Sequence, residues 1–375
     1  MKIIINTTNL KVGGALQVAI SFIYECINFD ENEYFIFLSP SMFQEIQQDK
    51  FPNYFTFYQF DNPSRLILFD KTINELNEEE KKINPDIVFS IFGPTYWKPR
   101  SKHVMGFANG LYLYDESPYF NSFSFSDKIK FKLKKEYHKL LLKSNADFYI
   151  LQTEDMKKRF SKFVAKEEDI MQVVSSRYDS IFEQTINDLN LLPYKDEDEF
   201  WFVTISAYYP HKKLDLINDL VSLIKKENLN IKFILTLSDE ITEQHFKNVK
   251  EYIINLGPVK LEECPYIYTN ADALFLPTLI ESFTASYPEA MIMKKPILTS
   301  HYSFAKTVCK DAALYFDPYD INDIMNQIRK IYTDKKLYAD LVTKGLDIVK
   351  GLPSSKERAH QYLNICKKVI QNVQK

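Results

Sequence analysis

The chain is poor in cysteine and glycine for its length. Its 375 residues hold 4 cysteines and 8 glycines. No CxxC or Cys/His spacing indicates a zinc site, and the disulfide framework of a small secreted domain is lacking. We therefore expect no bound metal and a reducing compartment, with single cysteines at Cys26, Cys264, Cys309 and Cys366.

Long hydrophobic runs and an excess of positive charge are lacking as well. No stretch reaches the ~20 apolar residues of a membrane-spanning helix, and the first residues turn polar too soon for a signal peptide. The net charge is −3 and the isoelectric point is near 6.1, so the basic excess of a nucleic-acid-binding domain is missing. We expect a cytoplasmic protein without a nucleic-acid partner.

The first half of the chain alternates between strand-like and helix-like segments. Hydrophobic residues make up 45% of the sequence, which is enough for two domain cores. Strands are predicted at residues 2–6, 34–38, 86–91, 103–107 and 148–151, and helices at 15–26 and 128–143. This alternation is typical of a parallel, doubly wound α/β sheet.

An acidic stretch at residues 193–199 interrupts the pattern, which then starts again. We interpret it as a solvated linker, because charge blocks are usually exposed and its Asp-Glu-Asp triplet lacks a preceding strand that would hold it around a metal. Strands follow at 200–205, 231–237, 273–277 and 296–298, with one near 256, and helices at 213–227, 243–255 and 264–269. The predicted units are 1–190, 196–355 and a C-terminal helix at 356–375.

Two acids flank a predicted strand–loop–helix junction in the second domain. Glu281 falls in the loop after the apolar run that ends at Pro277, and Glu289 falls on the helix that follows. Ligands of open α/β sheets bind at the carboxyl ends of the strands, and a helix N-terminus attracts phosphate. Taken alone, however, the pair is explained equally well as two surface acids at an ordinary helix start.

The surroundings of this pair resemble the C-terminal signature of the GT4-type, group 1 retaining glycosyltransferases. The resemblance covers most of residues 200–320 in order and spacing, and it rests on residues 256–259, 271–277, Glu281, Phe283, 289–291, Pro296 and 311–318. It implies the GT-B fold, in which two Rossmann-like doubly wound domains face a central cleft and the last helix, here 356–375, crosses back to the first domain.

The resemblance also implies a role for each acid. Glu281 would lie beside the donor sugar and its α-phosphate, in a catalytic role, and Glu289 would hold the ribose hydroxyls. The backbone N–H groups at Phe283 and Thr284 would receive the diphosphate. Ser282 and Thr284 stand where the family commonly has glycine, which narrows the space beside the sugar.

A second motif, residues 204–217, looks like the family's phosphate-gripping loop. Lys212 stands at the position of the family's clamping lysine and is the second candidate catalytic residue, while Ser206 is a further donor-binding candidate. The usual arginine is absent, because Ala207 occupies its place. A single ammonium still neutralises a departing diphosphate. The candidates for a replacement cation are Lys213, His211 and Arg177, of which Lys213 and Arg177 join the donor-binding set.

Three further residues are assigned to the acceptor side of the cleft by the resemblance. Gly13 and Gly14 follow the first strand, where a Gly-Gly pair lets backbone approach a ligand, although turns use such pairs constantly. Asn109 is the nearest candidate for a polar residue beside the reacting sugar. His103 lies inside a strand and is expected to be structural.

The helix predicted from Lys128 to Lys143 carries the strongest local excess of positive charge in the sequence. Its lysines either form a solvated face or meet an anionic membrane surface. Helical spacing places one apolar stripe on this helix, and we expect the stripe to cover the sheet. The stripe is formed by Ile129, Leu133, Tyr137 and Leu140.

The function implied by the resemblance is a retaining, metal-independent glycosyltransferase without a cofactor. It would move a sugar from a UDP- or GDP-sugar to a saccharide or lipid-linked saccharide in cell-envelope polysaccharide synthesis, in the cytoplasm or peripherally at the inner face of the membrane. Two alternatives stay open. One is a GT-B nucleotide-sugar epimerase, and the other is a non-catalytic partner subunit with a decayed nucleotide site.

Overall fold

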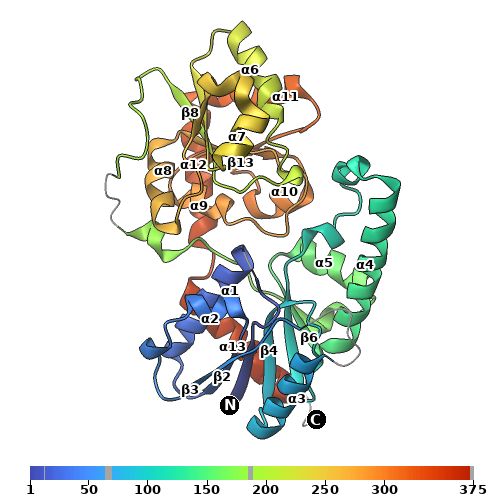
Figure 1. Cartoon of the computed structure of the whole chain (residues 1–375). Coiled ribbons are helices and arrows are strands. Elements are labelled where there is room, and N and C mark those ends of the chain that lie inside the picture. The colour runs from blue at the N-terminus through green and yellow to red at the C-terminus, as the bar shows by residue number, and fades with distance from the viewer. Residues whose placement is uncertain (12, 64–69, 185–188, 372–375) are drawn as a thin grey trace. The chain divides into compact units, whose positions relative to one another are not determined.

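The computed structural model describes residues 1–11, 13–63, 70–184 and 189–371, which form two compact units (Figure 1). The first unit comprises Met1–Asp115, Phe123–Ser176 and Pro353–Lys375, and the second comprises Glu116–Ser122 and Arg177–Leu352. The structure thus changes unit at Arg177, whereas the sequence pattern predicts the change after residue 190. The last four residues of the helix predicted at 356–375 lie outside the described residues.

The first unit is built on a seven-stranded parallel sheet in the order β3-β2-β1-β4-β5-β6-β7. Its central strands are rich in β-branched and aromatic residues, and Ile3, Ile4 and Ile5 are fully buried, as expected for a sheet covered on both faces. The strands are β1 Lys2–Asn6, β2 Glu33–Leu38, β3 Phe55–Gln59, β4 Ile87–Gly93, β5 Lys102–Phe107, β6 Phe148–Leu151 and β7 Met171–Val173, and the helices are α1 Gly14–Glu25, α2 Pro40–Glu45, α3 Lys71–Ile83, α4 Phe125–Asn145, α5 Glu154–Val164 and α13 Ser355–Gln371.

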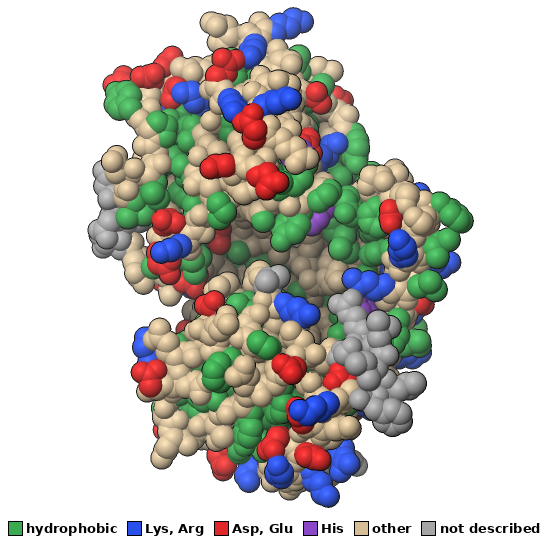
Figure 2. Space-filling model, in the orientation of Figure 1, with side chains coloured by type: hydrophobic (Ala, Val, Ile, Leu, Met, Phe, Trp, Pro, Cys, Tyr) green, Lys and Arg blue, Asp and Glu red, His purple; other side chains and the backbone are tan. Residues whose placement is uncertain are grey.

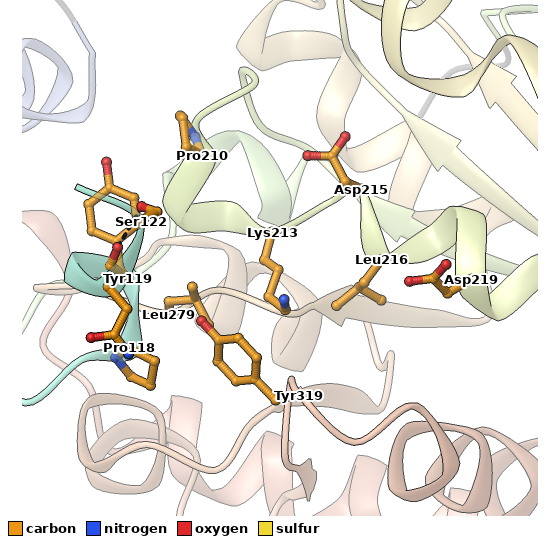
Figure 3. A pocket seen from close by; sticks show the side chains of 11 residues that line it. Pro118, Tyr119, Ser122, Pro210, Lys213, Asp215, Leu216, Asp219, Leu279 and Tyr319 are labelled. Atoms are coloured by element: carbon orange, nitrogen blue, oxygen red, sulfur yellow. Dashed lines mark hydrogen bonds between the residues drawn. The ribbon is translucent and has the colours of Figure 1, made fainter. Parts of the chain in front are cut away.

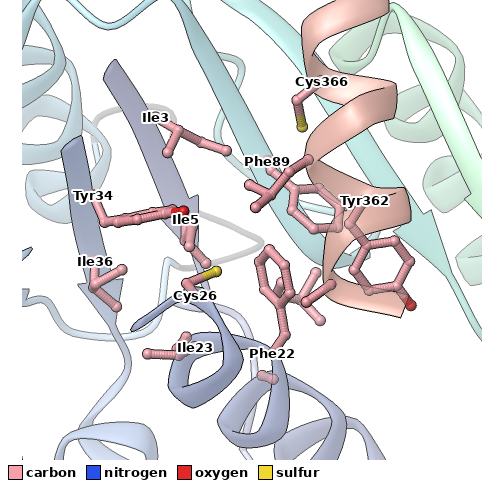
Figure 4. Close-up of a cluster of buried hydrophobic side chains, with 14 of the residues drawn as sticks. Ile3, Ile5, Phe22, Ile23, Cys26, Tyr34, Ile36, Phe89, Tyr362 and Cys366 are labelled. Atoms are coloured by element: carbon pink, nitrogen blue, oxygen red, sulfur yellow. The ribbon is translucent and has the colours of Figure 1, made fainter. Parts of the chain in front are cut away.

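Helix α13, the last of the chain, completes the core of this first unit. The ring of Tyr362 packs edge-on against Phe22 of α1 and Phe89 of β4, with centroids 5.3 Å apart in both cases (Figure 4). Arg358 donates a hydrogen bond to the hydroxyl of Ser21 at 3.0 Å. The chain therefore returns to the first unit after completing the second.

The second unit carries a six-stranded parallel sheet in the order β10-β9-β8-β11-β12-β13. Side chains at helix starts accept backbone N–H groups, for example Ser238 before α7 and Asp320 before α11, which fixes where these helices begin. The strands are β8 Phe200–Thr204, β9 Ile231–Leu235, β10 Ile253–Asn255, β11 Ala273–Leu276, β12 Ile297–Ser300 and β13 Ala313–Phe316, and the helices are α6 Leu216–Lys226, α7 Asp239–Phe246, α8 Cys264–Asn270, α9 Ser286–Ile292, α10 Ser303–Cys309, α11 Ile321–Thr333 and α12 Lys335–Lys350.

Each sheet has one point where the order of the strands along the chain reverses. In the first sheet this point lies between β1 and β4, and in the second between β8 and β11. Loops that leave two such neighbouring strands diverge to opposite faces of the sheet and leave a crevice at the carboxyl edge. The loops after β8 and β11 are the two that carry the predicted motifs of the second domain.

Several sequence predictions differ from the structure. The helix predicted at 243–255 divides into α7, a 3-10 segment at Lys247–Tyr252 and strand β10. The helix predicted from residue 213 begins at Leu216, because Lys213 adopts a left-handed conformation with φ of 52°. Strands β3, β7 and β13 were not predicted, since a short edge strand carries little periodic signal.

The prediction of a solvated acidic linker is wrong for Glu199. This carboxylate is buried, forms an ion pair with Lys232 at 2.5 Å and accepts a hydrogen bond from the indole N–H of Trp201 at 2.9 Å. It anchors the entry to β8.

The orientation predicted for α4 is also wrong. Ile129, Leu133 and Leu140 are exposed by 45%, 67% and 64%, and do not cover the sheet. The buried positions of this helix are Lys135, His138, Leu142 and Asn145. No helix among the described residues is both long enough and apolar enough to cross a membrane.

Candidate functional site

The loops that follow β8 and β11 lie against each other in the second unit. The 3-10 turn Pro210–Lys212 ends the first loop, and the backbone N–H of Leu279 in the second loop donates to the carbonyl of His211 at 2.7 Å. The hydroxyl of Thr204, the last residue of β8, donates to the carbonyl of Phe275 in β11. The two predicted motifs therefore meet at the crevice where the strand order reverses.

Lys212 and Glu281 form the centre of this arrangement. The Lys212 ammonium lies 2.5 Å from a carboxylate oxygen of Glu281, and the two side chains are only 11% and 12% exposed. The hydroxyl of Thr278 donates to the same carboxylate at 3.0 Å. A nearly buried cation and anion thus hold each other in place at the carboxyl edge of the sheet.

His211 lies beside this pair. Its ring contacts Tyr119 edge-on at a centroid distance of 5.8 Å and stacks on Tyr209 at 5.5 Å. Burial lowers the pKa of His211, the neighbouring Glu281 acts in the opposite direction, and Lys212 lowers it further. The imidazole is therefore mainly neutral near pH 7 and adds no fixed positive charge to the site.

Glu289 lies in the first turn of α9, and the phenol of Tyr268 donates to its carboxylate at 3.3 Å. Burial raises the pKa of Glu289 to about 7, the hydrogen bond from Tyr268 acts against this shift, and the negative charge of Asp179 adds to it. The sequence predicts Glu289 on this helix, about two turns beyond Glu281, with Phe283 and Thr284 at the helix start. Because α9 begins at Ser286, the N–H groups of Phe283 and Thr284 instead belong to the loop before it.

The other residues predicted to bind the sugar donor differ in their surroundings. Ser206, Ser282 and Phe283 are partly buried, and Thr284 is buried. The backbone N–H of Ser206 donates to the hydroxyl of Thr236 at 3.1 Å. The guanidinium of Arg177 forms an ion pair with Glu183 and lies over the ring of Tyr178, 4.3 Å from its centroid, so it is already engaged by its own neighbours.

Lys213 points into a separate cavity of about 490 Å³ in the second unit (Figure 3). Its ammonium lies over the ring of Tyr319, 4.1 Å from the centroid. Lys213 has a left-handed backbone, and its ammonium contacts Tyr319, whereas that of Lys212 contacts Glu281. Sequence reasoning missed the cavity, because it is assembled from four separate segments that contribute Pro118, Tyr119, Asn121, Ser122, Pro210, Lys213, Asp215, Leu216, Asp219, Leu279 and Tyr319.

The predicted acceptor-side residues all lie in the first unit. Gly13 has φ of 81° and immediately precedes α1, which begins at Gly14, and a Cβ atom added at either glycine would meet nothing within 4 Å. The side chain of Asn109 accepts the backbone N–H of Leu111 at 3.1 Å and thereby caps a 3-10 turn. The glycine loop is open, whereas Asn109 also has a local structural role.

His103 is buried, as expected of a structural histidine. One ring nitrogen lies 2.7 Å from the hydroxyl of Ser90 and the other contacts the carbonyl of Asn145. Burial lowers the pKa of His103 to about 4, although the bond to Asn145 acts in the opposite direction. The ring is neutral at physiological pH and connects two strands to the end of α4.

Comparison with known sequences gives two findings. Residues 193–347 match the family of glycosyl transferases group 1. The O-antigen chain mannosyltransferase RfbU of Salmonella typhimurium is 25% identical over 164 residues, which are 42% of this chain and 45% of that protein. The chain thus matches less than half of the length of this curated relative.

Solved structures resemble the chain over nearly its whole length. WaaG, a glycosyltransferase involved in lipopolysaccharide biosynthesis, has a TM-score of 0.72 at 13% identity and covers 98% of this chain and 99% of its own. Anabaena Alr3699/HepE in complex with UDP and glucose has a TM-score of 0.69 at 13% identity, and the match covers 97% of this chain and 98% of the Alr3699/HepE chain. These likenesses confirm the predicted GT-B class of two-domain α/β fold.

Proposed function

We propose that this chain, whose residues 193–347 match the family of glycosyl transferases group 1, transfers a sugar from a nucleoside-diphosphate sugar to a saccharide or lipid-linked saccharide acceptor. The observation that carries the proposal is the ion pair between Lys212 and Glu281, which joins the loops after β8 and β11, while Glu289 lies in the first turn of the helix that follows the second loop. A known relative that transfers mannose to an O-antigen chain supports cell-envelope polysaccharide as the product class.

The donor is assigned to the second unit. Glu289 accepts the two ribose hydroxyls, since an ionised carboxylate binds a vicinal diol through two charge-assisted hydrogen bonds. The diphosphate lies at Lys212, with Ser206, Ser282, Phe283 and Thr284 around it. UDP or GDP is the proposed nucleotide, and the complexes of Alr3699/HepE with UDP and with UDP-glucose support UDP.

The proposed reaction retains the configuration at the sugar and requires no metal or other cofactor. The ammonium of Lys212 stabilises the negative charge that builds up on the leaving diphosphate. The ion pair with Glu281 keeps that ammonium at one position before the donor arrives, so little reorganisation is needed during the reaction. Glu281 then orients the sugar or supports the positive charge that develops on it while the leaving phosphate takes the acceptor's proton.

The missing arginine of the phosphate loop has no evident substitute among the three candidates. Arg177 is held by Glu183, His211 is mainly neutral, and Lys213 extends into the cavity beside Tyr319. We therefore propose that Lys212 alone supplies the side-chain cation of the clamp. Backbone N–H groups of the loop before α9 supply the remaining donors.

The acceptor has two proposed contact regions. The open glycine loop at Gly13 and Gly14, together with Asn109, is the proposed region of the first unit. In the second unit, the cavity beside Lys213 has the composition of a saccharide subsite, with the rings of Tyr119 and Tyr319 for stacking and the carboxylate of Asp219 for hydroxyl groups. The proposed place of reaction is the cytoplasm or the inner face of the cell membrane.

Nucleotide binding and turnover test the proposal against its alternatives. A thermal-shift screen with UDP, GDP, ADP and their sugars should show a rise in Tm with one nucleotide and a smaller rise in Glu289→Ala. A decayed, non-catalytic subunit would show no rise in either protein. An epimerase would interconvert nucleotide-sugars without releasing the nucleotide, whereas a transferase releases it and consumes an acceptor.

A further inference from the structure

Helix α4 buries a largely polar face and exposes an apolar face on its opposite side. At 100° per residue, the buried residues Lys135, His138, Leu142 and Asn145 fall within an arc of about 80°. The large apolar residues exposed on the other face also fall within an arc of about 80°, nearly diametrically opposite the first, and are Phe125, Ile129, Leu133 and Leu140. We call the second set the outer stripe. The same arc holds one exposed acid, Glu136, and Tyr137, which is 42% exposed, lies beside it.

The outer stripe is far more exposed than apolar side chains usually are. Phe125 is 81% exposed, and Leu133 and Leu140 are 67% and 64% exposed. A contiguous row of such residues marks a contact surface, whereas single exposed apolar residues need no explanation. In Figure 2, hydrophobic and basic side chains alternate along the right-hand edge, where Figure 1 places α4.

Lysines border the outer stripe on both sides. The helix contains seven lysines and two acidic residues. Lys128 and Lys132 are exposed along one border and Lys130 along the other, while one of the acids, Glu136, lies within 4.0 Å of Lys139. An apolar row with a basic border fits a surface that combines negative charge with an accessible apolar interior.

We propose that α4 lies in the plane of an anionic membrane surface, with the outer stripe inserted between the lipid head groups and the bordering lysines in contact with lipid phosphates. The opposite, buried face keeps the helix attached to the first unit while it does so. The sequence predicts membrane contact through the lysines alone, with the apolar stripe packed on the sheet. The exposure of that stripe makes insertion the main interaction, and this inference does not depend on the proposed enzymatic activity.

Cosedimentation of the full-length chain with vesicles tests the proposal. We expect binding to vesicles of phosphatidylcholine containing about a third phosphatidylglycerol, and weaker binding to phosphatidylcholine alone. The variant Leu133→Ser/Leu140→Ser should lose at least 10-fold in vesicle affinity. Its matched control is Phe43→Ser on α2, a 40% exposed apolar residue of the same unit, which should bind like the wild type.

A charge series tests the contribution of the bordering lysines. Lys128→Glu/Lys132→Glu should bind anionic vesicles at least 10-fold more weakly, whereas Lys335→Glu/Lys336→Glu, which changes the net charge equally at exposed positions of α12, should have little effect. Circular dichroism confirms that each variant is folded.

Four outcomes would overturn the proposal. The first is a wild type that binds no vesicles, and the second is an outer-stripe variant that binds as well as the wild type, which would indicate adsorption by charge alone. The third is equal binding to neutral and anionic vesicles. The fourth is a wild-type dimer in sedimentation velocity that the Leu133→Ser/Leu140→Ser variant dissociates, which would make the stripe an interface between two copies of the chain.

Discussion

The ammonium group of Lys212 lies 2.5 Å from the Oε1 atom of Glu281, although the two residues are separated by 69 positions and come from loops after different strands. Neither side chain is more than 12% exposed. The pair ties the predicted phosphate loop to the predicted catalytic loop. It therefore affects both the stability of the second unit and the chemistry of the site.

Removal of one partner of this pair should destabilise the protein. Lys212→Met or Glu281→Gln leaves a nearly buried charge without its counterion, and we expect a loss of about 1–3 kcal/mol in the free energy of unfolding, less than for a fully buried pair. The double variant should lose less than the sum of the single losses. Urea unfolding of all four proteins gives the coupling, and strictly additive losses would contradict an energetic link between the two groups.

Substitution of Glu281 should lower the rate of sugar transfer much more than it weakens nucleotide binding. In Glu281→Ala we expect the rate of sugar transfer to fall by about 10²–10³-fold, since a group that acts mainly in the transition state contributes little to ground-state binding. The Kd for the nucleotide, measured by calorimetry, should change by about threefold or less. Equal transfer rates in the variant and the wild type would remove Glu281 from the catalytic role.

The raised pKa of Glu289 should make the ligand-free protein less stable as the pH rises. The folded state binds a proton at Glu289 up to about pH 7, whereas the unfolded state releases it near 4.5. The contribution of Glu289 to the free energy of unfolding is therefore fully present below pH 4.5 and is lost as the pH rises to 7. Glu289→Gln should be more stable than the wild type by about 1–3 kcal/mol at pH 8 and similar to it at pH 4.5. A stability difference independent of pH would contradict this.

Nucleotide binding should respond to the same proton in the opposite direction. If Glu289 holds the ribose as proposed, the ribose hydroxyls donate to its ionised carboxylate, so binding must release the proton of Glu289 below pH 7. We expect the affinity of the wild type for its nucleotide to rise by about tenfold between pH 6 and pH 8, with a flatter profile in Glu289→Gln. Calorimetry in buffers of different ionisation enthalpy would detect the released proton.

Substitution of Asp219 should change the KM for the acceptor and leave the KM for the donor unchanged. If the cavity beside Lys213 binds the acceptor saccharide, Asp219→Asn weakens a charge-assisted hydrogen bond and should raise the KM for the acceptor by about 5–10-fold. The KM for the donor in acceptor-free hydrolysis should stay unchanged. Asp347→Asn, which alters an exposed carboxylate on α12, is the matched control. A higher KM for the donor would place the cavity on the nucleotide side.

The two α/β units were predictable because buried parallel strands are nearly continuous apolar runs. The acid pair and Lys212 were predictable because both loops follow such runs at the sheet's reversal point. Which face of α4 is buried was not, because the single apolar stripe of the sequence stays exposed and the fold buries the largely polar opposite face. The direction of Lys213 was also beyond prediction, since it depends on one left-handed residue.

Helix α13 has a consequence for the order in which this chain acquires its structure. Ala359, Tyr362, Leu363 and Cys366 lie in the core of the first unit but are synthesised after all residues of the second unit. Folding during synthesis usually proceeds from the N-terminal domain onward. Here the second unit has all its residues available first, and the nascent first unit keeps Phe22 and Phe89 without the Tyr362 ring that covers them until α13 has been made.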